Sequence, residues 1–393
     1  MTYSEKLVFL MVSSVCKKEN IVIDNENYRV FIDEKENKYV ESKSHDFHMI
    51  FRKSDGFTAK WGKTFKEDPE FNPFGAEIAD IEITKRCTGI RDKDGVRKVC
   101  SHCYKSNTGK GDYMTFETFL NVFEIWNQTK TLTQIAFGTD ASLLESANPD
   151  YWKIFDYCNK NGVTPNVTVA DVDEETAMKM AKTFGACAVS FYPSINKDRC
   201  YDSVERIVNA AKSIGKNMAV NIHALVSNET YEYLFELIED FHKDERLKGM
   251  NAIVFLSLKQ KGRGIHFNKV TDEQFKKLVD KCFEKNVRMG FDSCSCNKFF
   301  KAVKDREDYD QLYAMSEPCE STMFSSYVDC HGMFYPCSFM EKEGDWKEGI
   351  DIAKCSSFLN DIWYSSKVNE WRNNALEKAR CNGGCTSCPY YDI

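Results

Sequence analysis

The stretch that decides the fold is Ala79-Asp-Ile-Glu-Ile-Thr-Lys85, followed by three cysteines, Cys87, Cys100 and Cys103. The stretch predicts a strand that runs directly into a cysteine-bearing loop. Two residues separate Cys100 from Cys103, and twelve residues separate Cys87 from Cys100. Three thiolates on one loop can hold three irons of a four-iron cluster and leave the fourth iron open to a small molecule.

Outward from this loop, short apolar runs alternate with amphipathic stretches from about residue 78 to residue 292. The predicted strands cover residues 78–84, 133–138, 164–170, 186–192, 217–226, 252–258 and 288–292. Helices are expected to begin near Thr115, Asn148, Asp173, Asp202, Asn228 and Thr271. This alternation implies an α/β fold with parallel strands, as a partial or full barrel or, alternatively, a doubly wound open sheet. In barrels the active site lies at the C-terminal ends of the strands, where the cysteine loop begins.

The pattern divides the chain into three expected domains: an accessory region over 1–75, a barrel core over 76–292 and a cysteine-rich domain over 293–393. Residues 47–61 alternate on both sides of Ser54-Asp55-Gly56, which predicts a β-hairpin in the accessory region. Beyond residue 293 the strand–helix rhythm is lost, and the tail is rich in cysteine, aromatic residues and glycine. We expect it to be held by metal more than by a hydrophobic core.

The composition narrows the functional class. The chain has 393 residues, 17 of them cysteine, and a formal net charge of −7. An acidic balance argues against broad binding to nucleic acid, which needs a basic face. The apolar run within residues 6–15 predicts an N-terminal helix and not a secretory signal, and no run is long enough for a bilayer. We therefore expect a cytoplasmic protein without a membrane partner, in which clustered cysteines serve metal or redox chemistry.

Other interpretations of the cysteine loop stay open at this point. A structural zinc site needs four ligands, and His102 lies between two of the cysteines, so it is not a natural fourth ligand. The three cysteines can also be unrelated buried residues. Farther along, the segment Lys259-Gln-Lys-Gly-Arg-Gly264 lacks the spacing of a Walker loop. It is either a basic surface turn or a loop that receives a carboxylate.

The strand and its loop resemble the radical S-adenosylmethionine (radical SAM) superfamily, in which a strand ending in Thr-x-x-Cys enters a three-cysteine loop. Here Thr84 and Cys87 stand in that pattern, although the first spacing is twelve residues instead of three. The resemblance implies SAM contacts from the residues around the last cysteine and at later strand ends. These are His102, Tyr104, the Gly-Gly-Glu-like turn Gly138-Thr139-Asp140, Asn166 and Ser190. Taken singly, each is an ordinary polar or aromatic position.

The tail resembles the SPASM/twitch extensions of radical SAM enzymes. Cys319 is followed by twelve residues, Gly332, four residues and Cys337, and the chain ends with the pair Cys385 and Cys388. The resemblance implies that these four cysteines hold one auxiliary [4Fe-4S] cluster. The stretch from Gly290 onward is also similar to radical SAM proteins of phage and gut-metagenome type. There a cysteine placed like Cys294 replaces one of the terminal pair. Zinc is the alternative metal for the tail.

Taken together, the resemblance implies a radical SAM oxidoreductase with a SAM-binding [4Fe-4S] cluster on Cys87, Cys100 and Cys103. Such an enzyme cleaves SAM reductively to a 5′-deoxyadenosyl radical, which takes a hydrogen atom from the substrate. The expected substrate is a peptide or protein, and the expected electron donor is a flavodoxin or a ferredoxin. The alternatives are a dehydrogenase or cyclase acting on a small molecule or nucleotide, and a zinc-bound binding protein without enzymatic activity. The sequence indicates no catalytic acid or base.

Overall fold

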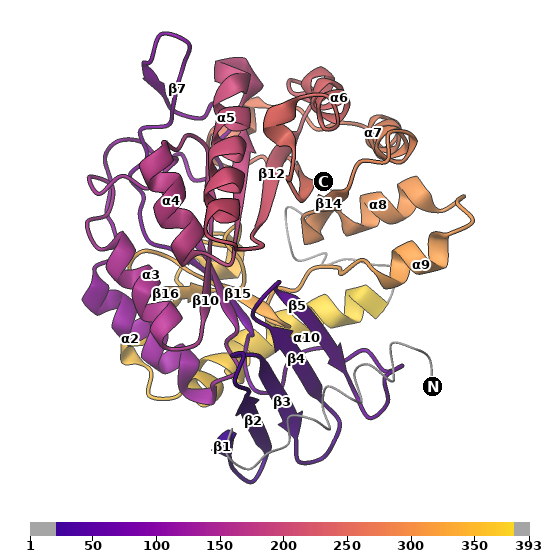
Figure 1. Cartoon of the computed structure of the whole chain (residues 1–393). Coiled ribbons are helices and arrows are strands. Elements are labelled where there is room, and N and C mark those ends of the chain that lie inside the picture. The colour runs from indigo at the N-terminus through magenta and orange to yellow at the C-terminus, as the bar shows by residue number, and fades with distance from the viewer. Residues whose placement is uncertain (1–20, 381–393) are drawn as a thin grey trace.

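The computed structural model describes residues 21–380, and its main body is a curved sheet covered by helices (Figure 1). The sheet has ten strands in the order β14-β13-β12-β11-β10-β9-β6-β15-β16-β17. The strands of the barrel core are β6 (Ile78–Glu82), β9 (Gln134–Gly138), β10 (Thr164–Val169), β11 (Ala186–Phe191), β12 (Ala219–Val226), β13 (Ala252–Ser257) and β14 (Met289–Phe291). All seven pair in parallel with their neighbours. Because β14 and β17 do not pair within the described residues, the barrel is partial.

Helices connect the parallel strands and cover the outer face of the sheet (Figure 1). They are α2 (Phe116–Trp126), α3 (Tyr151–Lys160), α4 (Glu174–Thr183), α5 (Pro193–Ser213), α6 (Tyr231–Asp240), α7 (Asp272–Glu284) and α8 (Cys296–Val303). The predicted N-caps form: the side chains of Thr115, Asp173 and Thr271 accept bonds from backbone N–H groups of the first turn. Gln274 completes a capping box with Thr271.

Along β12, side chains that pack in the hydrophobic core alternate with side chains that face the concave side of the sheet. Val220, Ile222 and Ala224 are fully buried among the core residues that pack beneath the helices. The intervening His223 and Leu225 point to the concave side and line a cavity there. Successive side chains of a strand point to opposite faces, so a single strand both builds the core and supplies the cavity wall.

The predicted strands and the helical alternation are confirmed, with boundaries that differ by a few residues and one larger shift. Helix α5 was expected near Asp202 but begins at Pro193, directly after β11. Proline suits the first helical position because its fixed φ is already helical and its missing N–H is not needed there. Asn196, with φ −164° and ψ 101°, interrupts the helix close to its start, which explains why the periodicity in the sequence becomes regular only later.

The N-terminal part forms a five-stranded antiparallel sheet in sequential order. Its strands are β1 (Ile21–Asp24), β2 (Tyr28–Ile32), β3 (Lys38–Ser42), β4 (His48–Arg52) and β5 (Phe57–Trp61). The predicted hairpin is confirmed as β4 and β5, with Gly56 at φ +74° in the turn. The ring of Tyr28 stacks on Phe74 at 4.2 Å, which joins this sheet to the start of the barrel. The expected N-terminal helix within residues 6–15 lies outside the described residues.

The tail departs from the expectation that metal, rather than a core, would hold it. Strand β15 (Ser325–Val328) pairs in parallel with β6, and β16 (Met333–Tyr335) and β17 (Ile350–Asp351) extend the same sheet. Trp346, Phe358 and Trp363 are buried in the main core, and Phe358 stacks on Trp126 of α2 at 4.8 Å. The aromatic residues of the tail therefore bury surface against the barrel. The last helices are α9 (Tyr309–Ala314) and α10 (Ser366–Arg380).

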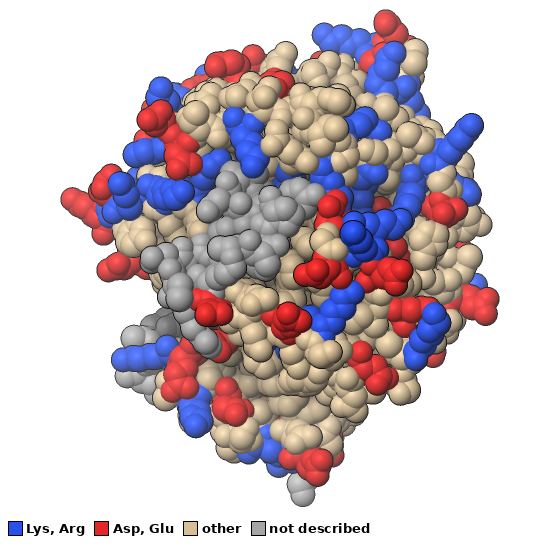
Figure 2. All heavy atoms as spheres, turned by 180° about the vertical axis from the view of Figure 1, so that it is seen from behind, with Lys and Arg blue, Asp and Glu red and all other residues tan. Residues whose placement is uncertain are grey.

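On the face seen in Figure 2, acidic and basic side chains are intermixed over the described residues. No helix between residues 21 and 380 has the length and apolar character that a membrane span requires.

Candidate active site

A cavity of about 550 Å³ opens at the C-terminal ends of the parallel strands. Its volume lies within the range of small-molecule sites, roughly 300–1,000 Å³. It brings together most of the site residues expected from the sequence: Cys87, Cys100, His102, Cys103, Tyr104, Gly138, Thr139, Asp140 and Ser190. The cysteine loop and the strand ends, which are far apart in the sequence, therefore meet in one place.

Hydrogen bonds hold the two ends of the cysteine loop together at the barrel. Its two ends, Ile83 and Met114, are bonded to each other through a backbone hydrogen bond of 3.0 Å. The buried amide of Asn148 donates to the carbonyls of both residues, at 2.8 and 3.0 Å. Such a side chain fixes both ends at once, because its two N–H groups point to different parts of the chain.

The segment that follows β13 holds the loop from the other side. The Arg263 guanidinium donates to the carbonyl oxygens of Cys100 at 2.7 Å and Asn107 at 3.1 Å, and its backbone N–H donates to that of Cys103 at 3.0 Å. Gly262 has φ +57°, and a Cβ added to it would lie 2.3 Å from the Tyr104 carbonyl oxygen. The segment 259–264 is therefore more than a plain surface turn, and both Lys259 and Arg263 line the cavity. It supports the cysteine loop.

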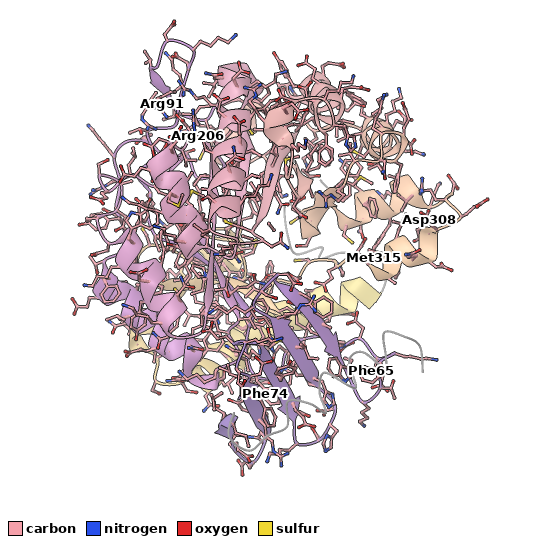
Figure 3. All side chains as sticks on the ribbon, viewed as in Figure 1. Phe65, Phe74, Arg91, Arg206, Asp308 and Met315 are labelled. Atoms are coloured by element: carbon pink, nitrogen blue, oxygen red, sulfur yellow. The ribbon has the colours of Figure 1, made fainter. Side chains whose placement is uncertain are left out.

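The twelve-residue insert between the first two cysteines forms a small hairpin, β7 (Ile90–Arg91) and β8 (Arg97–Lys98), that projects from the molecule (Figure 1). Arg91 anchors it through a bidentate pair with the buried carboxylate of Asp171, at 2.6 and 2.7 Å. Arg91 and Arg206 of α5 lie close together at its root (Figure 3). The insert thus bulges outward and leaves both of its end cysteines at the cavity.

The environment of the thiols suits a cationic partner. Burial raises the pKa of Cys87, and burial together with the charge of Cys103 raises the pKa of Cys100 to about 12. Without a metal these two thiols are therefore protonated at neutral pH. Metal ligation requires thiolates, and the positive charge of a metal centre offsets the burial and the mutual repulsion that raise these pKa values.

Aromatic rings form one wall of the cavity beside the cysteines. The His102 ring lies 5.3 Å from Tyr192 and meets Phe267 edge-on at 5.4 Å. Burial and the Arg263 cation lower the pKa of His102 to about 4, so the imidazole is neutral at pH 7. Tyr104 packs against Phe339 at 4.6 Å. A neutral aromatic wall of this kind suits stacking against a planar ring.

The strand ends contribute in different ways. A Cβ on Gly138 would lie 3.2 Å from the Cα of Glu82, so the backbones of β9 and β6 approach closely there. The Thr139 hydroxyl is bonded to backbone carbonyls, and Asp140 accepts bonds from two backbone N–H groups and, at 3.0 Å, from Tyr151. Asp140 therefore shapes the turn with its carboxylate. Ser190, on β11, faces the cavity.

Asn166 is the one expected SAM contact that the structure does not bring to the cavity. It lies nearer the N-terminal end of β10, where its amide donates to the Gln134 side chain at 2.8 Å and its oxygen accepts from the N–H of Ala186 at 2.8 Å. Thr168, two residues farther along the same strand, lines the cavity instead. Side chains two positions apart on a strand point to the same side, so Asn166 and Thr168 share a face, but only Thr168 is close enough to the C-terminal end of β10 to reach the cavity.

Several cavity residues were missed by the sequence analysis. Asp80 and Glu82 project inward from β6, and His223 projects from β12. Burial raises the pKa of Asp80 to about 6 and lowers that of His223 to about 4. The available signal was a titratable side chain at alternate positions of an otherwise apolar strand, since such a residue is costly to bury unless it faces a cavity or a partner.

A network of charged groups ties the cysteine loop to the tail. Lys105, two residues after Cys103, pairs with Glu341 and donates to the Tyr327 hydroxyl at 2.6 Å. Glu82 lies 3.6 Å from the Lys105 ammonium and accepts from Tyr327 at 3.3 Å. Although burial opposes it, Lys105 lowers the pKa of Glu341 to about 2. Buried charges of this kind persist only when they are paired and hydrogen-bonded.

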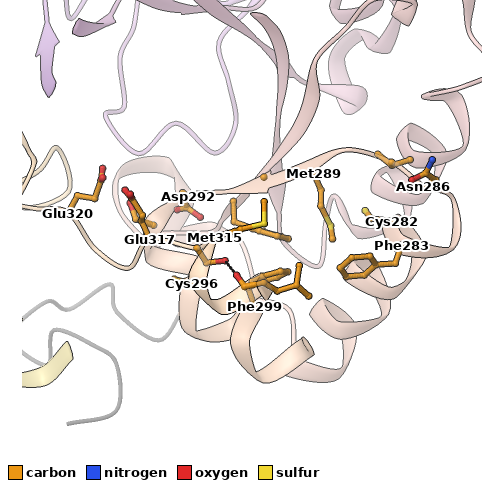
Figure 4. A pocket seen from close by; sticks show the side chains of 16 residues that line it. Cys282, Phe283, Asn286, Met289, Asp292, Cys296, Phe299, Met315, Glu317 and Glu320 are labelled. Carbon is orange, nitrogen blue, oxygen red and sulfur yellow. Dashed lines mark hydrogen bonds between the residues drawn. The ribbon is translucent and has the colours of Figure 1, made fainter. Parts of the chain in front are cut away.

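The tail cysteines lie near the same region as far as the structure describes them. Cys337 lies just after strand β16, and its neighbours Ser338 and Phe339 line the main cavity. Next to it, a second cavity of about 660 Å³ (Figure 4) has Asp292 in common with the first. It is lined by neighbours of Cys294 and Cys319, including Glu317 and Glu320. Cys385 and Cys388 lie outside the described residues.

Comparisons with known proteins support the fold. No protein-family profile and no curated protein matches the sequence. Among solved structures, the radical SAM enzyme SuiB of Streptococcus suis, bound to precursor peptide SuiA, matches with a TM-score of 0.57 and 10% identity, over 83% of this chain and 87% of SuiB. BtrN in complex with AdoMet and 2-DOIA matches with a TM-score of 0.39 and 12% identity, over 80% and 93% of the two chains. The likeness to SuiB, over most of both chains, shows that the two proteins share a fold.

Proposed function

We propose that this chain is a radical SAM enzyme that modifies a peptide or protein. The observation that carries the proposal is the meeting of three loop thiols with the ends of successive parallel strands in one cavity. In this proposal Cys87, Cys100 and Cys103 hold a [4Fe-4S] cluster whose fourth iron is open to SAM. When bound, the two groups supply reductive cleavage of SAM to a 5′-deoxyadenosyl radical that takes a hydrogen atom from the substrate.

The donor set and its surroundings fit these cofactors. Burial raises the pKa of Cys87 and Cys100, so these half-buried thiols need a cationic centre to be thiolates. Arg263 and Gly262 fix the loop backbone, so the thiols are held in position before any cofactor binds. A neutral His102 against Tyr192 offers a stacking surface for adenine. The turn Gly138-Thr139-Asp140 lines the cavity and is the proposed place for the methionine amino group.

The chain's own share of the chemistry is binding, orientation and exclusion of water. The aromatic wall and the strand ends orient the nucleoside, and Thr168 and Ser190 add hydroxyl groups to the cavity lining. Tyr327, Glu82 and Lys105 close the cavity floor through their network and exclude solvent there. Low solvent access protects a reactive radical from side reactions.

The tail cysteines are proposed to hold an auxiliary [4Fe-4S] cluster beside this cavity. The neighbours of Cys337 line the main cavity, and those of Cys294 and Cys319 line the adjoining one. This arrangement favours Cys294 as a ligand together with Cys319 and Cys337. A cluster there would be close enough to exchange an electron with the substrate.

The peptide substrate is proposed from the likeness of fold to SuiB, which was solved with a precursor peptide.

The test of the cluster and of SAM cleavage compares anaerobically reconstituted wild type with two variants, Cys100→Ser and Cys355→Ser. Cys355 is a tail cysteine outside the proposed ligand set. Wild type and Cys355→Ser should contain about eight irons and form 5′-deoxyadenosine from SAM and dithionite, and Cys100→Ser should contain about four and form none. Wild type without iron and without SAM cleavage would overturn the proposal.

A further inference from the structure

A group of possible metal ligands lies in the N-terminal sheet, in a part of the fold that the proposed function does not use. Glu41 is on β3, His48 begins β4, and His45 is in the turn between these strands. One ligand atom from each, the Glu41 carboxylate oxygen, His45 Nδ1 and His48 Nε2, lies within 4.8 Å of the other two. Among residues 21–380 this is the one such group of three His, Cys, Asp or Glu side chains.

The distances suit a small divalent ion. Glu41 Oε1 lies 3.2 Å from His45 Nδ1 and 3.9 Å from His48 Nε2. Tetrahedral zinc with bonds of about 2.0–2.1 Å sets its ligand atoms about 3.3 Å apart. One of the three pairs therefore has the required spacing, and the second needs a shift of about half an ångström, which a glutamate side chain supplies by rotation. The third pair, the two histidine nitrogens, lies within 4.8 Å and closes by rotation of the exposed His45 ring. Two histidines and a carboxylate leave the fourth zinc position for water.

His48 is prepared for ligation by its surroundings. Its Nδ1 lies 3.1 Å from the Gly62 carbonyl oxygen, to which it donates, and this leaves the lone pair on Nε2 directed toward Glu41. The ring is parallel to Trp61 at 5.2 Å, so it cannot turn freely. A backbone carbonyl that fixes the tautomer of a histidine is the usual support behind a metal-ligating imidazole.

The backbone brings the third ligand into place. His45 has φ +57°, in the left-handed region that non-glycine residues seldom adopt. This conformation sends its ring back over the turn, where it lies 6.2 Å from the His48 ring and parallel to within 20°. The His45 side chain is 69% exposed and that of His48 is 16% exposed. An ion therefore has a route from solvent to a partly buried ligand pair.

We propose that Glu41, His45 and His48 form a zinc site on the N-terminal sheet, distinct from the cysteine sites. A bound ion would join the β3–β4 turn to the end of β5 through His48, Trp61 and Gly62. This site is independent of SAM chemistry, so it can exist whether or not the proposed function holds.

The test measures zinc per chain on full-length, cluster-loaded protein after equilibration with chelator-buffered Zn²⁺. His45→Asn removes the ligand and keeps a residue that tolerates left-handed φ. His242→Gln changes an exposed histidine elsewhere and serves as the matched control. Wild type and His242→Gln should bind one zinc more than His45→Asn and His48→Gln, with unchanged iron content.

Zinc K-edge absorption identifies the ligands directly. The zinc that His45→Asn loses should show nitrogen and oxygen neighbours at about 2.0–2.2 Å and no sulfur at 2.3 Å. Equal zinc in wild type and His45→Asn would overturn the proposal, and so would a lost ion that has sulfur ligands. Loss of iron together with zinc would also count against it, because the cysteine sites would then be the source of the difference.

Discussion

Replacing Arg263 by methionine should loosen the cysteine loop without changing a single ligand. The substitution keeps an unbranched side chain but removes the donors to the Cys100 carbonyl at 2.7 Å and the Asn107 carbonyl at 3.1 Å. A hydrogen bond to a charged group is worth about 1.5–3 kcal/mol. Because Arg263 is only partly buried, we take the lower value for each bond, which gives about 3 kcal/mol. Loop opening should therefore become roughly 100-fold more frequent, at about 1.4 kcal/mol for each factor of ten.

The assay follows iron transfer to a coloured ferrous chelator under anaerobic conditions. The fast phase should accelerate by up to about 100-fold in Arg263→Met, since iron leaves through the open loop. Cys100→Ser, which lacks the loop cluster, identifies the phase that belongs to the auxiliary cluster. Arg288→Met is the matched control, because Arg288 also donates to a backbone carbonyl, that of Met250 at 2.8 Å, at the opposite end of the barrel.

The two variants separate support of the loop from general stability. If Arg263→Met and Arg288→Met release iron at the same rate, or if neither differs from wild type, the assigned role of Arg263 is wrong. Arg263→Lys should recover only part of the effect, because a lysine ammonium cannot span two carbonyls with the fixed geometry of a guanidinium.

The other predictions concern backbone fit, pH and the insert. Gly262→Ala should lower the melting temperature and the iron content more than Gly215→Ala, since both residues have positive φ but only Gly262 would place a Cβ against the cysteine loop. Burial lowers the pKa of Lys38 from 10.5 to about 7. Between pH 7 and pH 10.5 the unfolded chain therefore binds more protons than the folded chain. The free energy of unfolding should rise with pH over this range, by up to about 1.4 kcal/mol per pH unit. Chemical denaturation of Lys38→Met at several pH values should show no such rise in the free energy of unfolding. Asp171→Asn should weaken the bond to Arg91 and speed hydrogen exchange in residues 88–99, and unchanged exchange would contradict the anchoring role.

The alternation of strands and helices could be predicted because each barrel strand is a short apolar run between turn or cap signals. Burial on both faces makes such runs visible in sequence. The three-cysteine loop was equally clear, and the structure brings all three cysteines to one cavity. The position of Asn166 relative to the cavity could not be predicted in this way. The strand was right, but the C-terminal edge of the sheet is set by pairing with β9 and β11, and that register is a tertiary property.

The strands of the tail could not be predicted from the sequence for a different reason. Its cysteines dominate the sequence pattern, and they suggested a domain held by metal. Strand β15 is only four residues long and reaches its partner β6 across more than 240 residues of chain. Pairing at such separation leaves no local signal, because what stabilises the strand is the sheet edge it joins and the aromatic core beneath it.

The same long-range pairing explains why the site has parts from every region of the chain. Pairing of β15 with β6 places Tyr327 beside Glu82, on the strand that leads into the cysteine loop. Lys105, just beyond the last cysteine, then completes the network with Glu341 from the tail. Removing one member would leave the others buried without their partner, at a cost larger than a surface ion pair. The loop geometry therefore depends on the folded tail, and truncation before residue 325 should abolish iron binding at Cys87, Cys100 and Cys103, although all three remain in the chain.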